Sequence, residues 1–425
     1  MSSLGKLKRS LYLYLSAYFR FWADISLKRW NPRVIAVTGS VGKTTMLHLL
    51  ELQLGELAHY SHNANSSFGV AFDIVGLRGI TNTKWRWLYL AVAVPIRALW
   101  FKHDQEFYVV EIDGERPKEA EFLAKWLKPE VTLWVSLGRS HAAHFDGQVK
   151  KGLFTTVEEA IANEFASLVR ASQKLVIIDS ASSLMRRFSS DIQAERRQVS
   201  SKDLKNYSVW PDKTEFKMVA GTFSFAYPMP RETYVQLAMI EVAMAYLKLP
   251  VRYNMGDFTM PPGRSSYLRG KNGLKIIDSS YNAHLISMTS ILQMMQDMQT
   301  DHKWLVIGDM IEQGAGEAEE HVKLGKILSK VDAEKYVLVG RRVSQHTSSV
   351  LEKSGLGDKT VSFTKTSDAL EYLNKELTGK ETVLLKGSQY LEWIAEKLLD
   401  DPSDIVKLAR QELAAKKRRA KWGLN

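Results

Sequence analysis

Short apolar runs that end in glycine or polar residues recur along the chain and alternate with stretches of helical periodicity. In the first half of the chain these runs occupy residues 34–37, 107–111, 131–138 and 175–179. Helical patterns, such as those over residues 118–127 and 157–171, separate them. Strands that alternate with helices in this way form a parallel sheet with helices on both faces. The pattern predicts an α/β chain whose central part is a doubly wound, mostly parallel sheet.

A second alternation of strands and helices follows a break in composition at residues 260–264, which read Met-Pro-Pro-Gly-Arg. Its predicted strands lie at residues 274–278, 304–309, 336–340 and 382–387. The pattern indicates a smaller, Rossmann-like α/β domain. We therefore expect three regions: a basic amphipathic N-terminal helix at 1–32, a central domain at 33–262, and a C-terminal domain with a basic tail at 263–425.

The first 30 residues show apolar side chains at helical spacing with basic residues between them. The apolar positions are Leu4, Leu7, Leu11, Leu15, Tyr18 and Trp22. A basic, aromatic-rich helix of this kind lies either in a membrane interface or against the protein's own surface, and the pattern does not decide between the two. The apolar run at 11–19 is too short to span a bilayer, which takes about 20 apolar residues. A second apolar stretch at 88–101 reads as a packed or interfacial helix.

Composition narrows the chemistry that the chain can perform. The 425 residues are 45% hydrophobic and 25% charged, as in ordinary globular proteins, and include no cysteine. Disulfides, iron–sulfur clusters, thiolate zinc sites and cysteine nucleophiles are therefore excluded. The net charge of +11 makes polyanions and anionic membranes candidate partners, although no motif for nucleic-acid binding is recognisable. We expect a cytoplasmic monomer without a nucleic-acid partner, and peripheral contact with the inner face of the membrane through residues 1–30 stays open.

The strongest local signal is a glycine-bearing loop between a predicted strand and a predicted helix. Residues 38–45 read Thr-Gly-Ser-Val-Gly-Lys-Thr-Thr, directly after the apolar run at 34–37. A loop of this kind wraps phosphate with backbone N–H groups and a helix N-terminus, here Gly39, Ser40, Val41, Gly42, Lys43, Thr44 and Thr45. The Lys43 ammonium adds positive charge, and the Thr44 hydroxyl can ligate Mg²⁺. Although the loop is shorter than the strict phosphate-loop spacing, it predicts binding of ATP or GTP.

Polar residues follow two other predicted strands in the first half. Glu111 ends one strand, where it is either a second Mg²⁺ ligand or a surface carboxylate. His141 follows another strand and is either a ligand or a hydrogen-bonded turn residue. Ligands of parallel sheets bind beyond the carboxyl ends of the strands, so we expect both residues near the phosphate loop.

Two polar segments follow strands in the C-terminal half, at residues 278–283 and 386–388. In the first, Ser279 or Ser280 could serve as a helix N-cap instead of binding a ligand. The second could hold an anion or begin a capped helix. His321, after an acidic run, reads as a solvated helix residue rather than a ligand.

Taken together, the order and spacing of these segments resemble the Mur ligase family, and within it the D-alanyl-D-alanine-adding branch. Residues 38–45 are similar to the family's short phosphate loop. Further similar segments, with the branch pattern in brackets, are 63–70 (N-x-N-N-x-I-G-V), 111–117 (E-x-G-x-x-x-P-G), 136–141 (N-I-G-x-A-H), 263–264 with 277–288 (G-R, then I-D-D-x-Y-N-A-N-P-x-S-M), 306–314 (V-L-G-D-M-x-E-L-G) and 385–388 (V-K-G-S). The resemblance runs from about residue 33 to 400.

The resemblance implies an ATP-dependent ligase that forms an amide bond on a peptide-bearing cell-wall precursor, adding D-alanyl-D-alanine or a similar amine. A precursor carboxylate would take the γ-phosphate of ATP, and the amine would displace phosphate from the resulting acyl phosphate. The implied cofactors are ATP and Mg²⁺. The implied catalytic residues are Lys43, Glu111 and His141, and the implied metal ligands are Thr44, Glu111 and His141. The implied nucleotide contacts are residues 39–45, Arg264 and Asn282, and the implied substrate contacts are Asn65, Ser66, Asp309, Lys386 and Ser388.

Several departures from the family's pattern bear on these expectations. The family usually carries a lysine, modified to a carbamate, where residues 161–165 read Ile-Ala-Asn-Glu-Phe. Either Glu164 or water replaces the carbamate at the second metal, or that metal site is weak. An asparagine that contacts adenine is replaced near Val235 and Gln236, and Ser279 and His284 stand for an aspartate and an asparagine. Only about 32 residues precede the core, so a UDP-gripping domain is not expected, and the acceptor could be UDP-linked or lipid-linked.

Two other functions fit the same residues. The first is a ligase for another lipid-linked or poly-glutamyl acceptor in the same superfamily; its amidating branch, which uses a four-cysteine zinc ribbon, is disfavoured by the absence of cysteine. The second is a non-catalytic nucleotide-binding scaffold that kept the fold after losing the lysine. The presence of Lys43, Glu111 and His141 favours an enzyme.

Overall fold

The computed structural model describes residues 3–62, 64–79, 85–139, 142–281, 283–311 and 316–424, with side chains described from residue 15 onward. His141 and Asn282, two of the predicted site residues, lie outside the described residues. The chain divides into two compact units, Met1–Ser200 with Ala238–Val251 and Ser201–Leu237 with Arg252–Asn425. Each unit is described by itself below. The domain boundary that we predicted between residues 262 and 263 stays a prediction.

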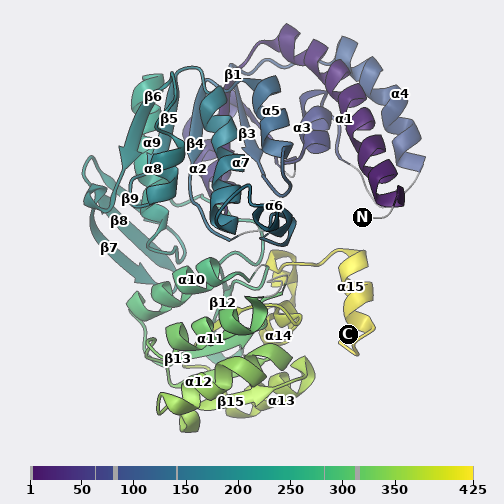
Figure 1. Ribbon diagram of the computed structural model, residues 1–425. Coiled ribbons are helices and arrows are strands. Elements are labelled where there is room, and N and C mark those ends of the chain that lie inside the picture. Colours follow the sequence, from purple (N-terminus) through teal and green to yellow (C-terminus); the bar gives the residue numbers. More distant parts are fainter. Residues whose placement is uncertain are drawn as a thin grey trace. The chain divides into compact units, whose positions relative to one another are not determined.

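The first unit is built on a six-stranded parallel sheet in the order β2-β3-β1-β4-β5-β6 (Figure 1). Its strands are β1 (Arg33–Thr38), β2 (Ala58–Tyr60), β3 (Phe107–Ile112), β4 (Val131–Trp134), β5 (Leu175–Asp179) and β6 (Glu195–Val199). The four predicted apolar runs form β1, β3, β4 and β5, whose residues are almost all buried. Such continuous apolar strands are typical of a parallel sheet that is covered on both faces. The predicted doubly wound α/β fold is confirmed.

Helices connect these strands. The principal ones are α2 (Lys43–Leu54), α3 (Ser67–Ile74), α5 (Glu119–Leu127), α6 (Asp146–Lys150), α7 (Val157–Ala171) and α8 (Ser183–Phe188), with short 3₁₀ segments at Gly55–Leu57 and Ala142–His144. The long helix α9 (Thr233–Leu247) contributes residues to both units. Side chains from α7, such as Ile161 and Phe165, form an apolar cluster with Trp134 of β4 and Ile178 of β5. The sheet and its helices therefore share a buried core.

The predicted N-terminal helix is α1 (Ser3–Trp30), and it lies beside α4 (Trp85–Trp100) in Figure 1. Phe19, Ala23 and Leu27 of α1 are buried in one cluster with Phe72 of α3 and Val94 of α4. From residue 15 onward, one face of α1 is therefore packed on the protein's own surface. None of the described helices is long and apolar enough to cross a membrane.

Pro95 lies inside α4, where its missing N–H leaves the carbonyl of Ala91 without the usual helical partner. The Tyr18 hydroxyl of α1 donates a 2.7 Å hydrogen bond to this carbonyl. The guanidinium of Arg29 donates to the carbonyls of Leu99, at 2.6 Å, and Phe101 near the end of α4. The two helices are thus joined by polar bonds as well as by apolar contacts.

The second unit contains two sheets. The first has the order β10-β9-β8-β7 and consists of β7 (Leu204–Trp210), β8 (Lys213–Met218), β9 (Thr222–Phe225) and β10 (Asn254–Met255). Strands β7, β8 and β9 are antiparallel, and β10 pairs parallel to β9. The sequence pattern did not predict this sheet, because β7 and β8 mix buried with exposed residues and lack a continuous apolar run.

The second sheet of this unit is the predicted smaller α/β layer, in the order β11-β12-β16-β13-β14-β15. Its strands are β11 (Ser266–Arg269), β12 (Lys275–Asp278), β13 (Lys303–Gly308), β14 (Lys335–Val339), β15 (Thr360–Phe363) and β16 (Thr382–Lys386). All neighbouring pairs are parallel except β11 with β12. The four predicted strands are confirmed as β12, β13, β14 and β16, and the prediction missed the two edge strands.

Helices cover both faces of this sheet. They are α10 (Leu285–Asp297), α11 (Glu317–Leu328), α12 (Ser348–Lys353), α13 (Thr366–Glu376), α14 (Leu391–Leu398) and α15 (Leu413–Ala420), with a π-helical turn at Val343–Thr347 and 3₁₀ segments at Ser201–Asp203, Lys271–Gly273, Gly357–Lys359 and Pro402–Lys407. Alternate strand residues point to opposite faces: Leu305 clusters with α10 and α11, and Val306 clusters with α13 and α14. This alternation explains how one apolar strand contributes side chains to the apolar clusters on both faces of the sheet.

Two local predictions in this unit are wrong. Helix α10 is capped by His284 and Ser287, not by Ser279 or Ser280, because the chain runs several residues beyond β12 before the helix begins. His321 is fully buried rather than solvated. Its Nδ1 lies 2.7 Å from the carbonyl of Glu317, and its Nε2 accepts from the N–H of Met310 at 3.1 Å, so it joins α11 to the end of β13.

Candidate functional site

The order of the first sheet brings three strand ends together. Strand β1 lies between β3 and β4, so the carboxyl ends of these strands are neighbours. The phosphate loop leaves β1, Glu111 and Asp113 lie at the end of β3, and Ser136 follows β4. This edge is where open parallel sheets bind ligands.

The backbone of the loop depends on its two glycines. Gly39 has φ 141° and Gly42, which precedes α2, has φ 83°. A Cβ on Gly39 would lie 2.8 Å from both the N and the O of Ser136. Only glycine combines this left-handed φ with so close an approach of two backbones. Glycine at position 39 therefore allows the loop to pass directly over the backbone of Ser136, just after β4.

Hydrogen bonds fasten the first part of the loop to the segment after β4. The N–H groups of Ser40 and Val41 donate to the carbonyl and the hydroxyl of Ser136, at 3.2 and 2.8 Å. The Ser40 hydroxyl in turn donates to the carbonyl of Gly138 at 2.9 Å. These two N–H groups are used inside the protein, whereas the first N–H groups of α2 have no helical partner and could donate to an anion. Phosphate binding by residues 39–45 stays a prediction.

Lys43 opens α2 and is buried, with 8% of its surface exposed. Its ammonium donates to the carbonyl of Gly39 at 2.6 Å and lies 3.3 Å from Oδ1 of Asp113, as an ion pair without aligned hydrogen-bond geometry. The sequence reasoning did not single out Asp113. Asp113 could have been predicted at this site from its position two residues after Glu111, because alternate residues of a strand lie on the same side.

Thr44 and Glu111, predicted as Mg²⁺ ligands, lie together. The Thr44 hydroxyl donates to Oε2 of Glu111 at 3.1 Å. Glu111 is nearly buried, and its backbone N–H donates to the hydroxyl of Ser61 at 2.8 Å, which fixes the end of β3. The oxygens around an octahedral Mg²⁺ are separated by about 3 Å, since its bonds are about 2.1 Å long. One hydroxyl and one carboxylate oxygen at this separation fit the ion.

The residue expected to replace the missing carbamate has another role. Glu164 of α7 is 5% exposed, and its two oxygens accept from the backbone N–H groups of Lys118 and Ala120 at 2.9 and 2.8 Å. It therefore holds the N-terminal end of α5, where a carboxylate also complements the helix dipole. Burial raises the pKa of Glu164 despite these bonds. The contacts favour a structural role over a metal-binding one.

The remaining predicted residues of the first unit lie near the same strand ends. Thr45 is half-buried in the first turn of α2. The carbonyl of Asn65 accepts from the N–H of Asp113 at 3.1 Å. Ser66 is the N-cap of α3, and its hydroxyl accepts from the N–H of Gly69 at 3.2 Å. Asn65 thus helps to position the end of β3, and Ser66 begins the next helix.

In the second unit, Asp278 and Lys386 end the neighbouring strands β12 and β16. Both are buried. Burial lowers the pKa of Lys386 from 10.5 to about 7; the charge of Asp278 opposes this shift, and that of Arg264 adds to it. Burial also raises the pKa of Asp278. The guanidinium of Arg264 lies over the ring of Tyr281, 4.9 Å from its centroid. A buried lysine of lowered pKa beside a buried carboxylate is typical of a functional site.

Asp309 and Ser388 lie at adjacent strand ends of the same sheet. Oδ1 of Asp309 accepts from the N–H groups of Arg342 and Val343 at 3.0 and 2.9 Å. Its Oδ2 accepts from the side chain of Gln389 at 3.0 Å, and its carbonyl accepts from the N–H of Ser388. Asp309 therefore supports the turns after β14 and β16. Its contact with substrate stays a prediction.

Comparisons with known proteins agree with this architecture. Residues 263–389 match the family described as Mur ligase, glutamate ligase domain. The UDP-N-acetylmuramoyl-tripeptide–D-alanyl-D-alanine ligase of Bacillus subtilis (strain 168) is 23% identical over 394 residues, which cover 89% of this chain and 79% of that protein. The corresponding ligase of Escherichia coli (strain K12) is 23% identical over 373 residues, covering 84% of this chain and 74% of that protein.

A solved structure shows the same fold. The crystal structure of the MurF ligase from Thermotoga maritima in complex with ADP has a TM-score of 0.70 and 18% sequence identity to this chain. The likeness covers 95% of this chain and 84% of that one. Residues 263–389 thus match a Mur ligase domain, and the chain as a whole is similar in sequence and fold to ligases of the D-alanyl-D-alanine-adding branch.

Proposed function

We propose that the chain is an ATP-dependent ligase that forms an amide bond on a peptide-bearing cell-wall precursor. The observation that carries the proposal is the pairing of Thr44 with Glu111 at 3.1 Å, one residue from the buried ammonium of Lys43. The relatives are named for a UDP-N-acetylmuramoyl-tripeptide and D-alanyl-D-alanine, so these are the first substrates to test.

The reaction has two steps, which the residues of the first unit can support. A precursor carboxylate oxygen attacks the γ-phosphorus of ATP, forming an acyl phosphate and releasing ADP. The amine nitrogen then attacks the acyl carbon, phosphate leaves with the electron pair of the broken carbon–oxygen bond, and the proton lost by the nitrogen passes to the departing phosphate. Lys43 would offset the charge of the transferring phosphoryl group, and Thr44 and Glu111 would hold Mg²⁺, which neutralises the nucleotide phosphates when bound. The roles of His141, Arg264, Asn282, Lys386 and Ser388 remain predictions within this proposal.

The direct test is ADP release that depends on an added acceptor. We expect ADP only when ATP, UDP-N-acetylmuramoyl-tripeptide and D-alanyl-D-alanine are all present, with a product whose mass is that of the joined substrates less water. Lys43→Ala should lower the rate about a hundredfold or more, because the phosphoryl transfer loses its fixed charge. Lys151→Ala removes an exposed lysine and should leave the rate unchanged.

Two results would replace this proposal. Release of ADP with a lipid-linked or poly-glutamyl acceptor, and not with the UDP-linked one, would assign the second ligase function. Tight nucleotide binding without turnover on any of these acceptors would show that the chain is a non-catalytic scaffold. This alternative is relevant because residues 161–165 lack the family's lysine.

We further propose that the chain contacts the inner face of the membrane from the cytoplasm, through α4 rather than through α1. The two outer turns and the middle of α4 expose large apolar side chains at helical spacing: Trp85, Leu88, Tyr89, Val92, Ile96, Leu99 and Trp100. Trp85 and Trp100 are 80% and 79% exposed at the two ends of the helix. A continuous apolar stripe of this length on a protein surface marks an interaction site.

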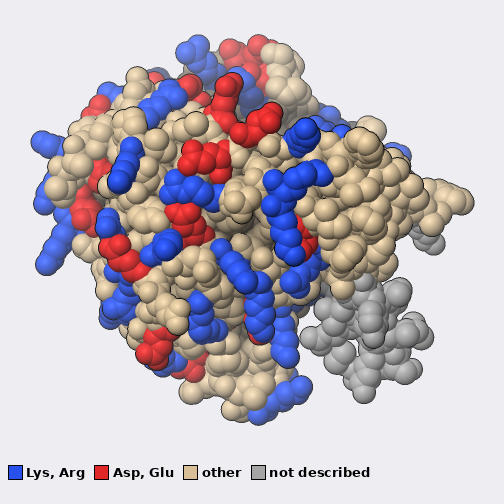
Figure 2. Space-filling view, turned by 90° about the horizontal axis from the view of Figure 1, so that it is seen from above, with Lys and Arg blue, Asp and Glu red and all other residues tan. Residues whose placement is uncertain are grey.

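The charges around this stripe favour an anionic lipid surface as the partner. No Asp or Glu occurs between Asp73 and Asp104, whereas this interval contains Arg78, Lys84, Arg86, Arg97 and Lys102. In Figure 2 the part of the right-hand side that is not grey, at the end where α1 and α4 lie in Figure 1, shows few charged side chains. An apolar helix face with aromatic residues and flanking basic residues is typical of interfacial membrane binding.

Sedimentation with vesicles containing phosphatidylglycerol tests this contact. Val92→Glu with Leu99→Glu places charge on the exposed stripe and should weaken binding about tenfold or more, since each side chain buries apolar area in the interface. The matched control, Val219→Glu with Leu153→Glu, changes equally exposed residues elsewhere and should bind like the unmodified chain. Equal binding by both double variants would refute the contact. Deleting residues 1–30 is a poor test, because it would uncover Phe72 and the rest of that core.

A further inference from the structure

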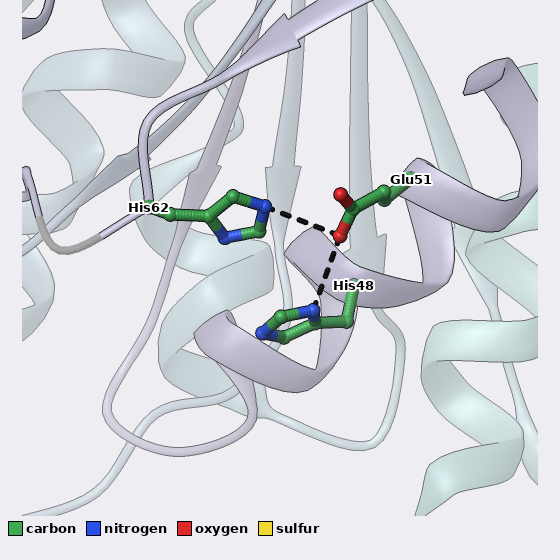
Figure 3. A group of neighbouring side chains, drawn as sticks. All are labelled: His48, Glu51 and His62. Atoms are coloured by element: carbon green, nitrogen blue, oxygen red, sulfur yellow. Dashed lines mark hydrogen bonds and ion pairs between the residues drawn. The ribbon is translucent and has the colours of Figure 1, made fainter. Parts of the chain in front are cut away.

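Three side chains outside the phosphate loop converge on one point of the first unit (Figure 3). His48 and Glu51 lie one turn apart on α2, and His62 lies in the segment that follows β2. Nδ1 of His48 lies 3.2 Å from Oε2 of Glu51, and Nε2 of His62 lies 3.1 Å from the same oxygen. The two imidazole rings stack with their centroids 4.8 Å apart.

We propose that His48, Glu51 and His62 form a binding site for Zn²⁺. One ligand atom from each side chain lies within 4.8 Å of the other two, and the described residues contain no second group of three such side chains. Bonds of about 2.0–2.1 Å in a tetrahedral zinc site separate neighbouring ligand atoms by about 3.3 Å. The two histidine–glutamate separations, 3.2 and 3.1 Å, are already close to that value, and the two imidazole ligand atoms lie within 4.8 Å of each other.

The chemical nature of the three ligands indicates which metal ions the site would bind. Two imidazoles and a carboxylate suit Zn²⁺ and similar transition-metal ions, whereas Mg²⁺ and Ca²⁺ prefer sites made of oxygen alone. Three protein ligands leave a coordination position open, and each of the three side chains is partly exposed, so an ion can enter from solvent. The chain has no cysteine that could compete for zinc as a thiolate.

The three side chains lie on elements that also position residues around the phosphate loop. Helix α2 begins at Lys43, and His62 directly follows Ser61, whose hydroxyl holds the backbone of Glu111. The carbonyl of Asn65 holds the N–H of Asp113 in the same way. An ion shared by α2 and His62 would therefore join the helix of the phosphate loop to the segment that positions the end of β3. We expect zinc to raise the unfolding temperature of the chain.

Calorimetry of Zn²⁺ binding to untagged, chelator-treated protein tests the site without reference to any enzymatic activity. We expect one ion per chain, and a rise in the unfolding temperature when zinc is added. His62→Ala should weaken binding about tenfold or more and abolish the rise, because the loss of a ligand leaves two. Glu51→Gln, which keeps the size of the side chain, should act in the same direction.

His302→Ala is the matched control. His302 also pairs with a carboxylate, Glu334 at 2.7 Å, but the described residues place no third ligand with this pair. This variant should bind zinc like the unmodified chain. Equal zinc affinity in His62→Ala and His302→Ala, or no binding to the unmodified chain, would overturn the proposal. Circular dichroism of each metal-free variant separates loss of the site from loss of the fold.

Discussion

The Thr44 hydroxyl lies 3.1 Å from Oε2 of Glu111, although 66 residues separate the two in the chain. The contact arises because β1 and β3 are parallel neighbours, with Val37 opposite Glu111. It places a hydroxyl and a carboxylate side by side where the helix that follows the phosphate loop begins. The proposed ligase activity rests on this pair.

Replacing Glu111 tests the role of that carboxylate. Glu111→Gln keeps the size of the side chain but removes its negative charge, so we expect acceptor-dependent ADP release to fall about a hundredfold or more and to require more Mg²⁺. Glu56→Gln, at an exposed site, should change neither quantity. Steady-state kinetics across a magnesium titration provides the measurement, and an unchanged magnesium dependence in Glu111→Gln would contradict the assignment.

The crossing of Gly39 over Ser136 predicts a strict requirement for glycine. Gly39→Ala should reduce nucleotide affinity about tenfold or more and lower the free energy of unfolding by about 2 kcal/mol, because the new Cβ meets backbone atoms at 2.8 Å and φ is 141°. Gly147→Ala meets no atom within 4 Å and should be near neutral. Titration with a fluorescent ADP and urea denaturation measure both effects. Unaltered affinity in Gly39→Ala would show that the loop does not face the nucleotide.

The lowered pKa of Lys386 predicts a pH dependence of stability. Its pKa falls from 10.5 to about 7 on folding, so between these values the unfolded chain holds the proton more often than the folded chain does. The free energy of unfolding therefore rises with pH in this window, by up to about 1.4 kcal/mol per pH unit from this group. Urea denaturation at pH 7 to 9.5 should show this rise in the unmodified chain and a weaker one in Lys386→Met. Parallel curves for the two proteins would mean that the lysine keeps its ordinary pKa.

The hydrogen bond from the Tyr18 hydroxyl to the carbonyl of Ala91 should contribute to the stability of the chain by joining α1 to α4. Tyr18→Phe leaves that carbonyl, already deprived of a helical partner by Pro95, without its donor, and we expect a loss of about 1 kcal/mol in the free energy of unfolding. Tyr89→Phe, on the exposed stripe of α4, is the matched control and should have no effect. Chemical denaturation compares the two. Equal stability would show that solvent satisfies the carbonyl.

Much of the fold could be predicted because it is encoded locally. The apolar runs that form β1, β3, β4 and β5 are continuous, and the phosphate loop follows its strand directly in sequence. The antiparallel sheet formed by β7, β8 and β9 could not be predicted in this way. Its strands are half exposed, so they lack the apolar runs on which the prediction depended.

The candidate site was predicted in part for the same reason. Thr44 lies just after the loop that leaves β1, and Glu111 lies near the end of β3, so a parallel sheet was expected to bring them together. The hydrogen bonds of Ser136 to the loop and the ion pair of Asp113 with Lys43 depend on register and close approach, which the sequence pattern does not contain. His321 was misjudged because an acidic neighbourhood suggested solvent, whereas its ring bonds two backbone groups in the core.

A crystal structure with a non-hydrolysable ATP analogue and Mn²⁺ in place of Mg²⁺ tests the central claim most directly, because the anomalous signal of manganese locates the ion. We predict phosphate oxygens at the N-terminal end of α2 beside Lys43, and the ion bonded to the Thr44 hydroxyl and to a Glu111 carboxylate oxygen. Nucleotide bound at another place, or an ion remote from both side chains, would contradict the account.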